Sequence, residues 1–191
     1  NVLKVAHSEI DGIGKKNVDV FCIGKKARDY FKRRDYNIVE SHTDFWNELN
    51  YSHAINIGEG VISHFTHKNV EEIHVVYNEF VNMASQNVRS ELLLPLVFEA
   101  EKVQTVGRLF EPNKEDIVKS LIPRHLNIQM WKYLLESYAS EHAARMLAME
   151  NATDNAQEMI KDLTLQFNKA RQAAITTEML EIVSGAEALQ G

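Results

Sequence analysis

The first two thirds of the sequence alternate between short apolar runs and amphipathic stretches. Apolar runs of about four to eight residues are typical of buried strands, and apolar residues three or four apart are typical of helices. This pattern predicts a helix to about His7, a turn over residues 11–16, a strand over 18–24, a helix to about Arg34, a turn over 35–37, a short strand over 38–41, and a helical stretch that starts at Thr43.

Two β-rich runs follow, over residues 72–83 and 87–98, and Ala84, Ser85 and Gln86 join them. A short connection between two strands favours an antiparallel ribbon. Because strand and helix signals alternate before this ribbon, we expect an α/β fold, namely a Rossmann-like doubly wound domain with the ribbon at the edge of its sheet.

The last third lacks the residues that interrupt helices. No glycine occurs between Gly107 and Gly185, and no proline follows Pro123. Apolar or small residues recur three or four apart from about Arg124 to Val183, which predicts one long helix. Roughly 60 residues at 1.5 Å per residue would span about 90 Å. The predicted domains are therefore an α/β domain over 1–112, lacking its N-terminal part, and a coiled-coil helix over 113–191.

The apolar stripe of this helix needs a partner, because an isolated amphipathic helix is only marginally stable in water. No other segment predicts an equally long helix, so the second helix of a coiled coil would come from a missing N-terminal part or from another subunit. The end of the helix is apolar on several sides, which favours insertion into a hydrophobic collar. The residues concerned are Ile175, Met179, Leu180, Ile182, Val183, Ala186 and Leu189.

Charge and composition narrow the possible functions. The chain has 191 residues and a formal net charge of -6, which argues against a general affinity for nucleic acid or anionic lipid. The one basic cluster, over residues 25–34, is interpreted as a solvated helix face. No run of about 18 apolar residues occurs, so any membrane role would be peripheral. The single cysteine, Cys22, excludes an internal disulfide, and its apolar neighbours predict a buried thiol.

Histidine and glycine patterns give weak signals for a ligand site. His64 and His67 are three residues apart and His74 follows, but two imidazoles without a fixed third ligand favour a solvent-facing helix over a metal site. Gly58 and Gly60 lack the third glycine and the strand-to-helix context of a phosphate-binding loop. We interpret this pair as a packing feature or a local helix irregularity.

Acid–base and aromatic residues give no stronger signal. Glu141 and His142 are adjacent, yet they lie on the long helix without a cleft, which disfavours acid–base catalysis. Trp46, Trp131 and Phe167 are expected to fill apolar seams. We therefore expect no catalytic residue, no cofactor and no metal.

The long helix carries a recognisable sequence. Its segments are SEHAARMLAMENATDNA from Ser140, LTLQFNKARQAAIT from Leu163, and the closing EMLEIVSGA from Glu178. Together they resemble the C-terminal signature of the γ subunits of F-type ATP synthases, and the CIGKKARDYF segment from Cys22 is compatible with that family. The family also has a long N-terminal helix and a first strand that are absent here, so this chain is expected to be a fragment.

The resemblance implies the central rotor shaft of the synthase, with two helices forming an antiparallel coiled coil inside a ring of three α and three β subunits. It implies that the α/β domain packs beside the ε subunit and on the membrane-embedded c-ring. The subunit would be non-catalytic, would couple proton-driven rotation to ATP synthesis or hydrolysis at the β subunits, and would regulate ATPase activity and proton flow.

The resemblance also implies a contact site and a location. The positions that match the family's contact with a β subunit are Arg171, Gln172, Thr176 and Glu178. The implied location is peripheral, at the cytoplasmic face of the bacterial plasma membrane, with the matrix face of the mitochondrial inner membrane as the alternative.

Two other functions stay open from the residues alone. A doubly wound domain can bind a nucleotide, with the long helix serving only for oligomerisation, although no phosphate-binding loop is present. Alternatively, the helix could form a self-associating coiled-coil scaffold. Nucleotide titration and light scattering would separate these two from a shaft.

Overall fold

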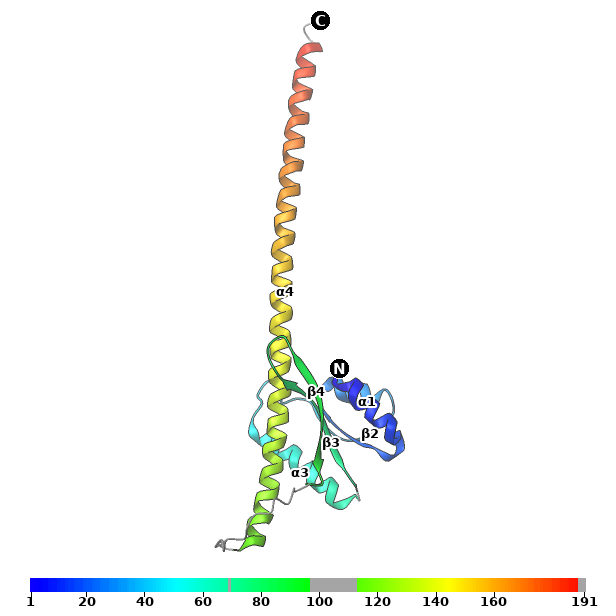
Figure 1. Ribbon diagram of the computed structural model, residues 1–191. Helices are drawn as coiled ribbons and strands as arrows, with labels where there is room; N and C mark the ends of the chain where they lie inside the picture. The colour runs from blue at the N-terminus through cyan, green and yellow to red at the C-terminus, as the bar shows by residue number, and fades with distance from the viewer. Residues whose placement is uncertain (69, 97–112, 189–191) are drawn as a thin grey trace. The chain divides into compact units, whose positions relative to one another are not determined.

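The computed structural model describes residues 1–68, 70–96 and 113–188. The chain divides into two compact units, Asn1–Ala143 and Ala144–Gly191. Figure 1 labels the helices and strands. In chain order they are α1 (Val2–Ile13), the 3-10 helix η1 (Lys15–Asn17), β1 (Asp19–Ile23), α2 (Lys25–Lys32), β2 (Asn37–His42), α3 (Tyr51–His67), β3 (Ile73–Phe80), β4 (Gln86–Leu94) and α4 (Lys114–Ala188).

Strands β1 and β2 pair in parallel, and helix α2 connects them. Alternate residues of β1 point to opposite faces of the sheet. Val20 and Cys22 are buried in a small core with Ile10 and Phe31, while Phe21 and Ile23 pack against the main core. The predicted strand–helix–strand order over residues 18–41 is confirmed.

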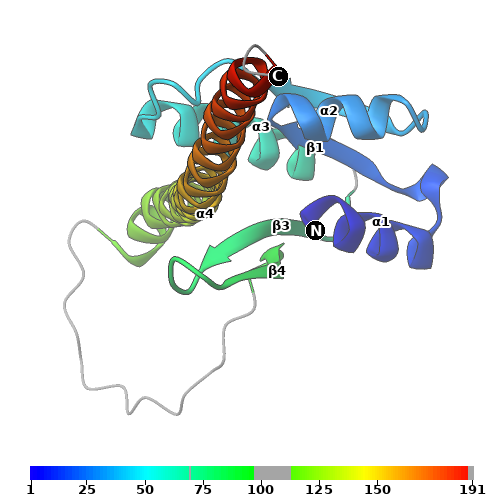
Figure 2. The same ribbon diagram turned by 90° about the horizontal axis from the view of Figure 1, so that it is seen from above.

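Strands β3 and β4 form an antiparallel hairpin, as predicted, but this hairpin is a separate two-stranded sheet. The prediction that it lies at the edge of the parallel sheet is wrong for the described residues, because β3 pairs with β4 alone and β1 with β2 alone. Helix α1 contacts both strands of the hairpin, and Figure 2 shows it alongside them. The last residues of the predicted run over 87–98 lie outside the described residues.

The main core of the first unit joins α3, the hairpin and residues 126–134 of α4. Its most buried members are Ala54 and Ile57 of α3 and Met130 and Leu134 of α4, each at most 2% exposed. The predicted α/β fold with a long C-terminal helix is thus confirmed.

Three helix boundaries differ from the predictions. Helix α1 continues to Ile13, and Gly14, at φ 98°, ends it, so the turn starts later than residue 11. Helix α3 starts at Tyr51 and not at Thr43, because the Asn50 side chain accepts a hydrogen bond from the Ser52 N–H and caps the helix there.

Helix α4 starts ten residues before the predicted Arg124. The Asn113 Oδ1 accepts a hydrogen bond from the backbone N–H of Asp116 at 2.8 Å, which is a capping contact. Pro123 lies inside the helix. A proline there removes one backbone hydrogen bond, yet Ile122 and Leu126 on either side of it pack against the main core and hold the helical path.

Candidate partner-binding surface on helix α4

The second half of α4 is a continuous helix whose polar side chains are partly used within the helix itself. Four threonine hydroxyls donate hydrogen bonds to the backbone carbonyl four residues earlier. These are Thr153 to Met149, Thr164 to Ile160, Thr176 to Gln172 and Thr177 to Ala173, at 2.7 to 3.0 Å. This bonding pattern hides the hydroxyl hydrogens from a partner and leaves apolar methyl groups on the helix surface.

Every residue from Ala148 to Ala188 is exposed. Large apolar side chains make up much of this surface, and most are more than half exposed. They are Met149, Met159, Ile160, Leu163, Leu165, Phe167, Ile175, Met179, Leu180, Ile182 and Val183. Exposed apolar surface of this extent marks a site for another protein or a membrane.

The four residues predicted to contact a partner, Arg171, Gln172, Thr176 and Glu178, are all exposed on this helix. At 100° per residue they occupy an arc of about 160° over two turns, with Arg171 and Glu178 in one row and Gln172 and Thr176 in another. Within the described ranges, the side chains of Arg171, Gln172 and Glu178 make no hydrogen bond or ion pair. Their polar groups are therefore available to a partner.

Arg171 is also distinctive in sequence. After Lys161, the only basic residues of the chain are Lys169 and Arg171, and the ten residues around Ile175 and Met179 are mainly apolar or small. A guanidinium presents a planar fork of donors that can bind a carboxylate with two parallel hydrogen bonds. The arrangement thus suits one directional polar contact within an otherwise apolar surface.

The histidines of the predicted weak metal pattern have separate partners. His64 Nε2 lies 2.8 Å from Asp19 Oδ2, His67 Nδ1 lies 2.8 Å from the Ser63 carbonyl oxygen, and His74 Nε2 lies 2.9 Å from Glu72 Oε2. The part of the chain that is described holds no group of three side chains suited to a metal ion.

Gly58 and Gly60 are packing glycines, which confirms that interpretation. A Cβ on Gly58 would clash with the side chain of Asn127 on α4, and one on Gly60 would lie 2.8 Å from a carboxylate oxygen of Glu40. The hollow next to Gly60, between β2 and α3, has a volume of about 200 Å³.

The aromatic residues separate into two groups. Trp46 and Trp131 pack against the main core, as predicted, whereas Phe167 is 66% exposed. The His142 ring lies 4.3 Å from the Tyr138 ring, and neither residue lines the hollow next to Gly60.

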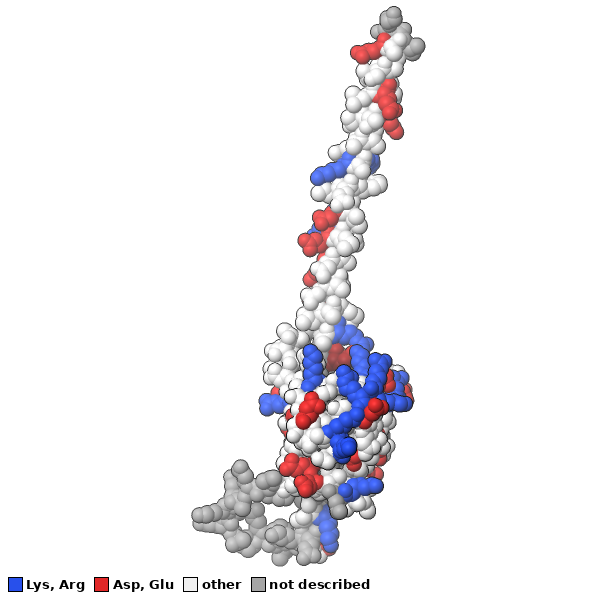
Figure 3. Space-filling view, turned by 90° about the vertical axis from the view of Figure 1, so that its right-hand side faces the viewer, with Lys and Arg blue, Asp and Glu red and all other residues white. Residues whose placement is uncertain are grey.

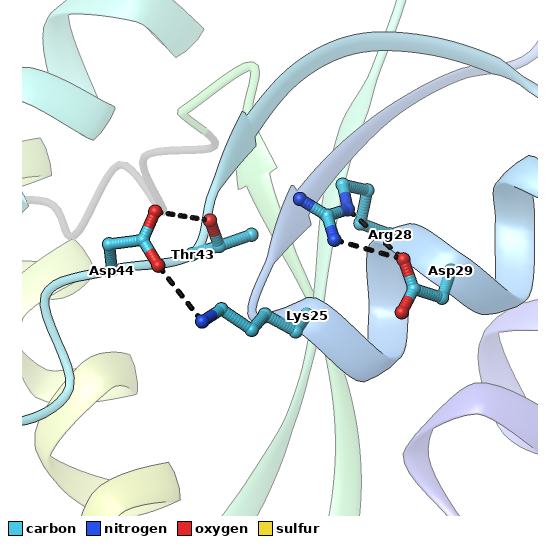
Figure 4. Close-up of polar contacts among 5 residues, drawn as sticks. All are labelled: Lys25, Arg28, Asp29, Thr43 and Asp44. Carbon is cyan, nitrogen blue, oxygen red and sulfur yellow. Dashed lines mark hydrogen bonds and ion pairs between the residues drawn. The ribbon is translucent and has the colours of Figure 1, made fainter.

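The basic residues of α2 and its flanks gather on one face of the first unit (Figure 3). Two of them have carboxylate partners, as Figure 4 shows: Lys25 Nζ lies 3.1 Å from Asp44, and Arg28 lies 3.1 Å from Asp29. The hydrogen bond from Lys25, and then that from Thr43, lower the pKa of Asp44. These pairs are exposed, so they contribute little to stability.

Cys22 is 1% exposed, as predicted for a buried thiol. Burial raises its pKa to about 11, although the charge of Arg28 opposes the shift. The thiol therefore stays protonated and unreactive near neutral pH.

Tyr77, Glu91 and Tyr133 form a partly buried polar cluster that was not predicted from the sequence. The Tyr77 hydroxyl donates a hydrogen bond to Glu91 Oε1 at 2.7 Å, and the Tyr133 hydroxyl donates one to Glu91 Oε2 at 3.1 Å. Burial raises the pKa of Glu91, but these two bonds outweigh it and the net pKa lies below its ordinary value. Burial and the Glu91 carboxylate raise the pKa of both tyrosines. The only sequence signal was a charged residue in an otherwise apolar strand end.

None of the described helices combines the length and the apolar character needed to cross a lipid bilayer.

The comparisons with known proteins agree on one family. A family model described as ATP synthase matches residues 1–189.

Two relatives are both named ATP synthase gamma chain. The protein from Prosthecochloris aestuarii is 43% identical over 191 residues, which is 100% of this chain and 65% of the relative. The protein from Christiangramia forsetii is 44% identical over 193 residues, which is 100% of this chain and 67% of the relative. The chain thus spans about two thirds of the length of these relatives.

Solved structures share the fold at lower identity. A chain of the Euglena gracilis mitochondrial ATP synthase, in a structure of OSCP/F1/c-ring, has a TM-score of 0.64 at 20% identity over 95% of this chain and 65% of that chain. A chain of the Tetrahymena thermophila mitochondrial ATP synthase central stalk/c-ring has a TM-score of 0.61 at 22% identity over 80% of this chain and 69% of that chain. Since the family model covers nearly the whole sequence and the gamma chains align along all of it, this chain belongs to the ATP synthase γ chain family.

Proposed function

We propose that this chain is the greater part of the central rotor shaft of an F-type ATP synthase. The observation that carries the proposal is the exposure of every residue from Ala148 to Ala188 on one helix rich in large apolar side chains. About 60 Å of such helix is not stable in water by itself and needs surrounding protein.

The shaft works by differential contact and performs no bond chemistry. One asymmetric helix pair inside a ring with threefold symmetry presents a different face to each β subunit, so the three nucleotide sites differ in affinity. Rotation of the shaft then changes each site in turn, which couples proton-driven c-ring rotation to ATP synthesis or hydrolysis. The same contacts would regulate ATPase activity and proton flow.

The proposed partners are three α and three β subunits, the ε subunit and the c-ring. Arg171, Gln172, Thr176 and Glu178 contact a β subunit in this proposal, which is supported by their exposure on one arc of α4. The association with the membrane is peripheral, at the cytoplasmic face of a bacterial plasma membrane. The bacterial location is supported by the two bacterial relatives described above.

The domain assignment belongs to the same proposal. Residues 1–112 form the α/β domain that receives the rotation, and 113–191 supply one helix of an antiparallel coiled coil. This division follows function and therefore differs from the compact units, which divide after Ala143 within α4. The second helix comes from a segment outside this chain.

Reconstitution tests the proposal. The full-length protein, mixed with the α and β subunits of the same source, is expected to give a complex that hydrolyses ATP and that pumps protons after addition of the membrane sector. A chain that stays separate from α and β on gel filtration, or one that binds nucleotide stoichiometrically alone, would contradict the shaft and support an enzyme.

A further inference from the structure

Four polar contacts tie the β3–β4 hairpin to α4 within the first unit. The first is the hydrogen bond from the Tyr133 hydroxyl to Glu91, whose carboxylate also accepts a hydrogen bond from Tyr77 within the hairpin, as described above. In addition, the Phe80 N–H donates to Glu136 Oε2 at 2.7 Å, the Gln86 Nε2 donates to the Ser140 carbonyl at 2.7 Å, and the Ser140 hydroxyl lies 3.4 Å from the Asn78 carbonyl. We name this set of contacts the hairpin clamp.

The clamp lies on one face of α4. Residues 133, 136 and 140 fall within an arc of about 60° and span two helical turns. At its centre the Tyr77 and Tyr133 rings are 4.6 Å apart, and both residues are at most 5% exposed. Ser140, about two turns further along α4, is fully buried. The hairpin therefore holds the helix at two separate levels along its axis.

Hydrogen bonds and apolar packing resist different motions. Apolar contact is non-directional, so a helix can turn slightly against an apolar surface at small cost. A hydrogen bond prefers an angle above about 150° and weakens steeply below about 120°, so the clamp opposes rotation of α4 about its own axis. For packing alone, a half-buried carboxylate between two tyrosines would be no better than an apolar cluster of the same shape.

We propose that the hairpin clamp, centred on Glu91, is where torque acting on the α/β domain enters helix α4. This inference rests on the proposed function and names the residues that carry the rotation into the shaft. Glu91 acts on α4 through Tyr133 and is thus a positioning residue.

The test replaces the polar centre by an apolar one. The triple variant Y77F/E91L/Y133F in the full-length protein removes both hydrogen bonds and leaves no unpaired buried group, so its folding is expected to survive. The single variant Y133F removes only the bond that reaches α4 and keeps the Tyr77–Glu91 bond. Each variant is assembled into the complete synthase in membrane vesicles.

We expect both variants to hydrolyse ATP at the wild-type rate in the detached catalytic sector, where no load opposes rotation. In vesicles, proton pumping per ATP hydrolysed is expected to fall as the opposing proton gradient rises, more for the triple variant than for Y133F. The thermal midpoint of the complex is measured in parallel, since a merely structural role would lower it together with hydrolysis in the detached sector.

The matched control is E79Q, which breaks the 2.7 Å Arg89–Glu79 ion pair on the same hairpin without touching α4. Wild-type pumping against the gradient in both clamp variants, or an equal loss in E79Q, would overturn the inference. Failure of the wild-type chain to assemble with α and β would instead overturn the proposed function and this inference with it.

Discussion

Arg171 and Lys169 lie two positions apart on α4 and therefore point about 160° away from each other. Both are exposed cations, so exchanging either for alanine removes the same charge from the same helix. We expect R171A to weaken the contact with a β subunit by about 1.5–3 kcal/mol, the range for a hydrogen bond to a charged group. ATP-driven pumping measures this effect.

K169A serves as the control for R171A. It is expected to retain pumping close to that of the wild type, and circular dichroism should show both variants equally helical. Wild-type pumping by R171A, or an equal loss in K169A, would remove the assigned role of Arg171.

Gly58 is buried on α3 where Asn127 of α4 approaches it. The Asn127 Oδ1 is buried, so the Asn127 side chain must shift within packed surroundings to make room for a methyl group at residue 58. We expect G58A to lower the free energy of unfolding by about 1–3 kcal/mol, as overpacking does. Thermal or urea unfolding measures the change.

Gly12 provides the matched comparison, because nothing lies within 4 Å of a Cβ placed there. G12A is expected to be neutral or to stabilise α1 by up to about 1 kcal/mol, since alanine favours helices over glycine. Equal stability of G58A and G12A would contradict the packing role of Gly58.

Glu91 predicts a pH dependence of stability. Its folded pKa lies below the ordinary glutamate value, so its contribution is present above the unfolded pKa and is lost as pH falls through the folded pKa. We expect unfolding of the wild type to become easier below about pH 4.5, and E91Q to lack part of that dependence. Identical acid profiles for the two proteins would contradict the role of the Tyr77 and Tyr133 hydrogen bonds.

At the scale of elements, the sequence predicted the type of each α-helix and strand more reliably than its ends. The parallel strands and the hairpin could be predicted from local apolar runs, because burial of these apolar residues stabilises the same strands. The start of α3 at Tyr51 was missed because the side-chain cap at Asn50 competes with a similar signal at Thr43. The start of α4 was missed because packing against the main core stabilises the helical conformation on both sides of Pro123.

The two halves of α4 should differ in dynamics. Residues 126–143 pack into the first unit, whereas residues 148–188 are exposed. Because helix stability in proteins comes mainly from packing, we expect amides of 148–188 to exchange rapidly with deuterium in the isolated chain at low concentration, where it is monomeric, and slowly in the assembled synthase. Residues 126–143 act as the internal reference, protected in both. Slow exchange over both ranges in the isolated chain would contradict the need for a partner.

At the scale of the molecule, the long apolar helix could be predicted because it is local in sequence, whereas the arrangement of the sheets could not. The pairing of β3 with β4 follows from their short connection, but whether this hairpin joins the parallel sheet depends on contacts between residues far apart in the chain, and periodicity does not report those contacts. The Glu91 cluster was missed for the same reason, since its three members come from β3, β4 and α4. The β-subunit contacts stay a prediction.

The isolated chain is expected to self-associate, because the apolar surface from Met149 to Val183 has no other cover in water. Light scattering should show an apparent mass that rises with concentration and falls when α and β subunits are added. A monomer at all concentrations would contradict this expectation, and a fixed, stable homo-oligomer that persists with α and β would favour a scaffold.

The seclusion of Cys22 has a practical consequence. As the sole thiol of the chain, at 1% exposure, it leaves the surface without a native site for maleimide chemistry. A cysteine in place of exposed Asn155 would then be the single position that takes up a dye or a bead. An observer could follow the turning of this one helix by fluorescence without first removing a natural sulfhydryl from residues 1–191.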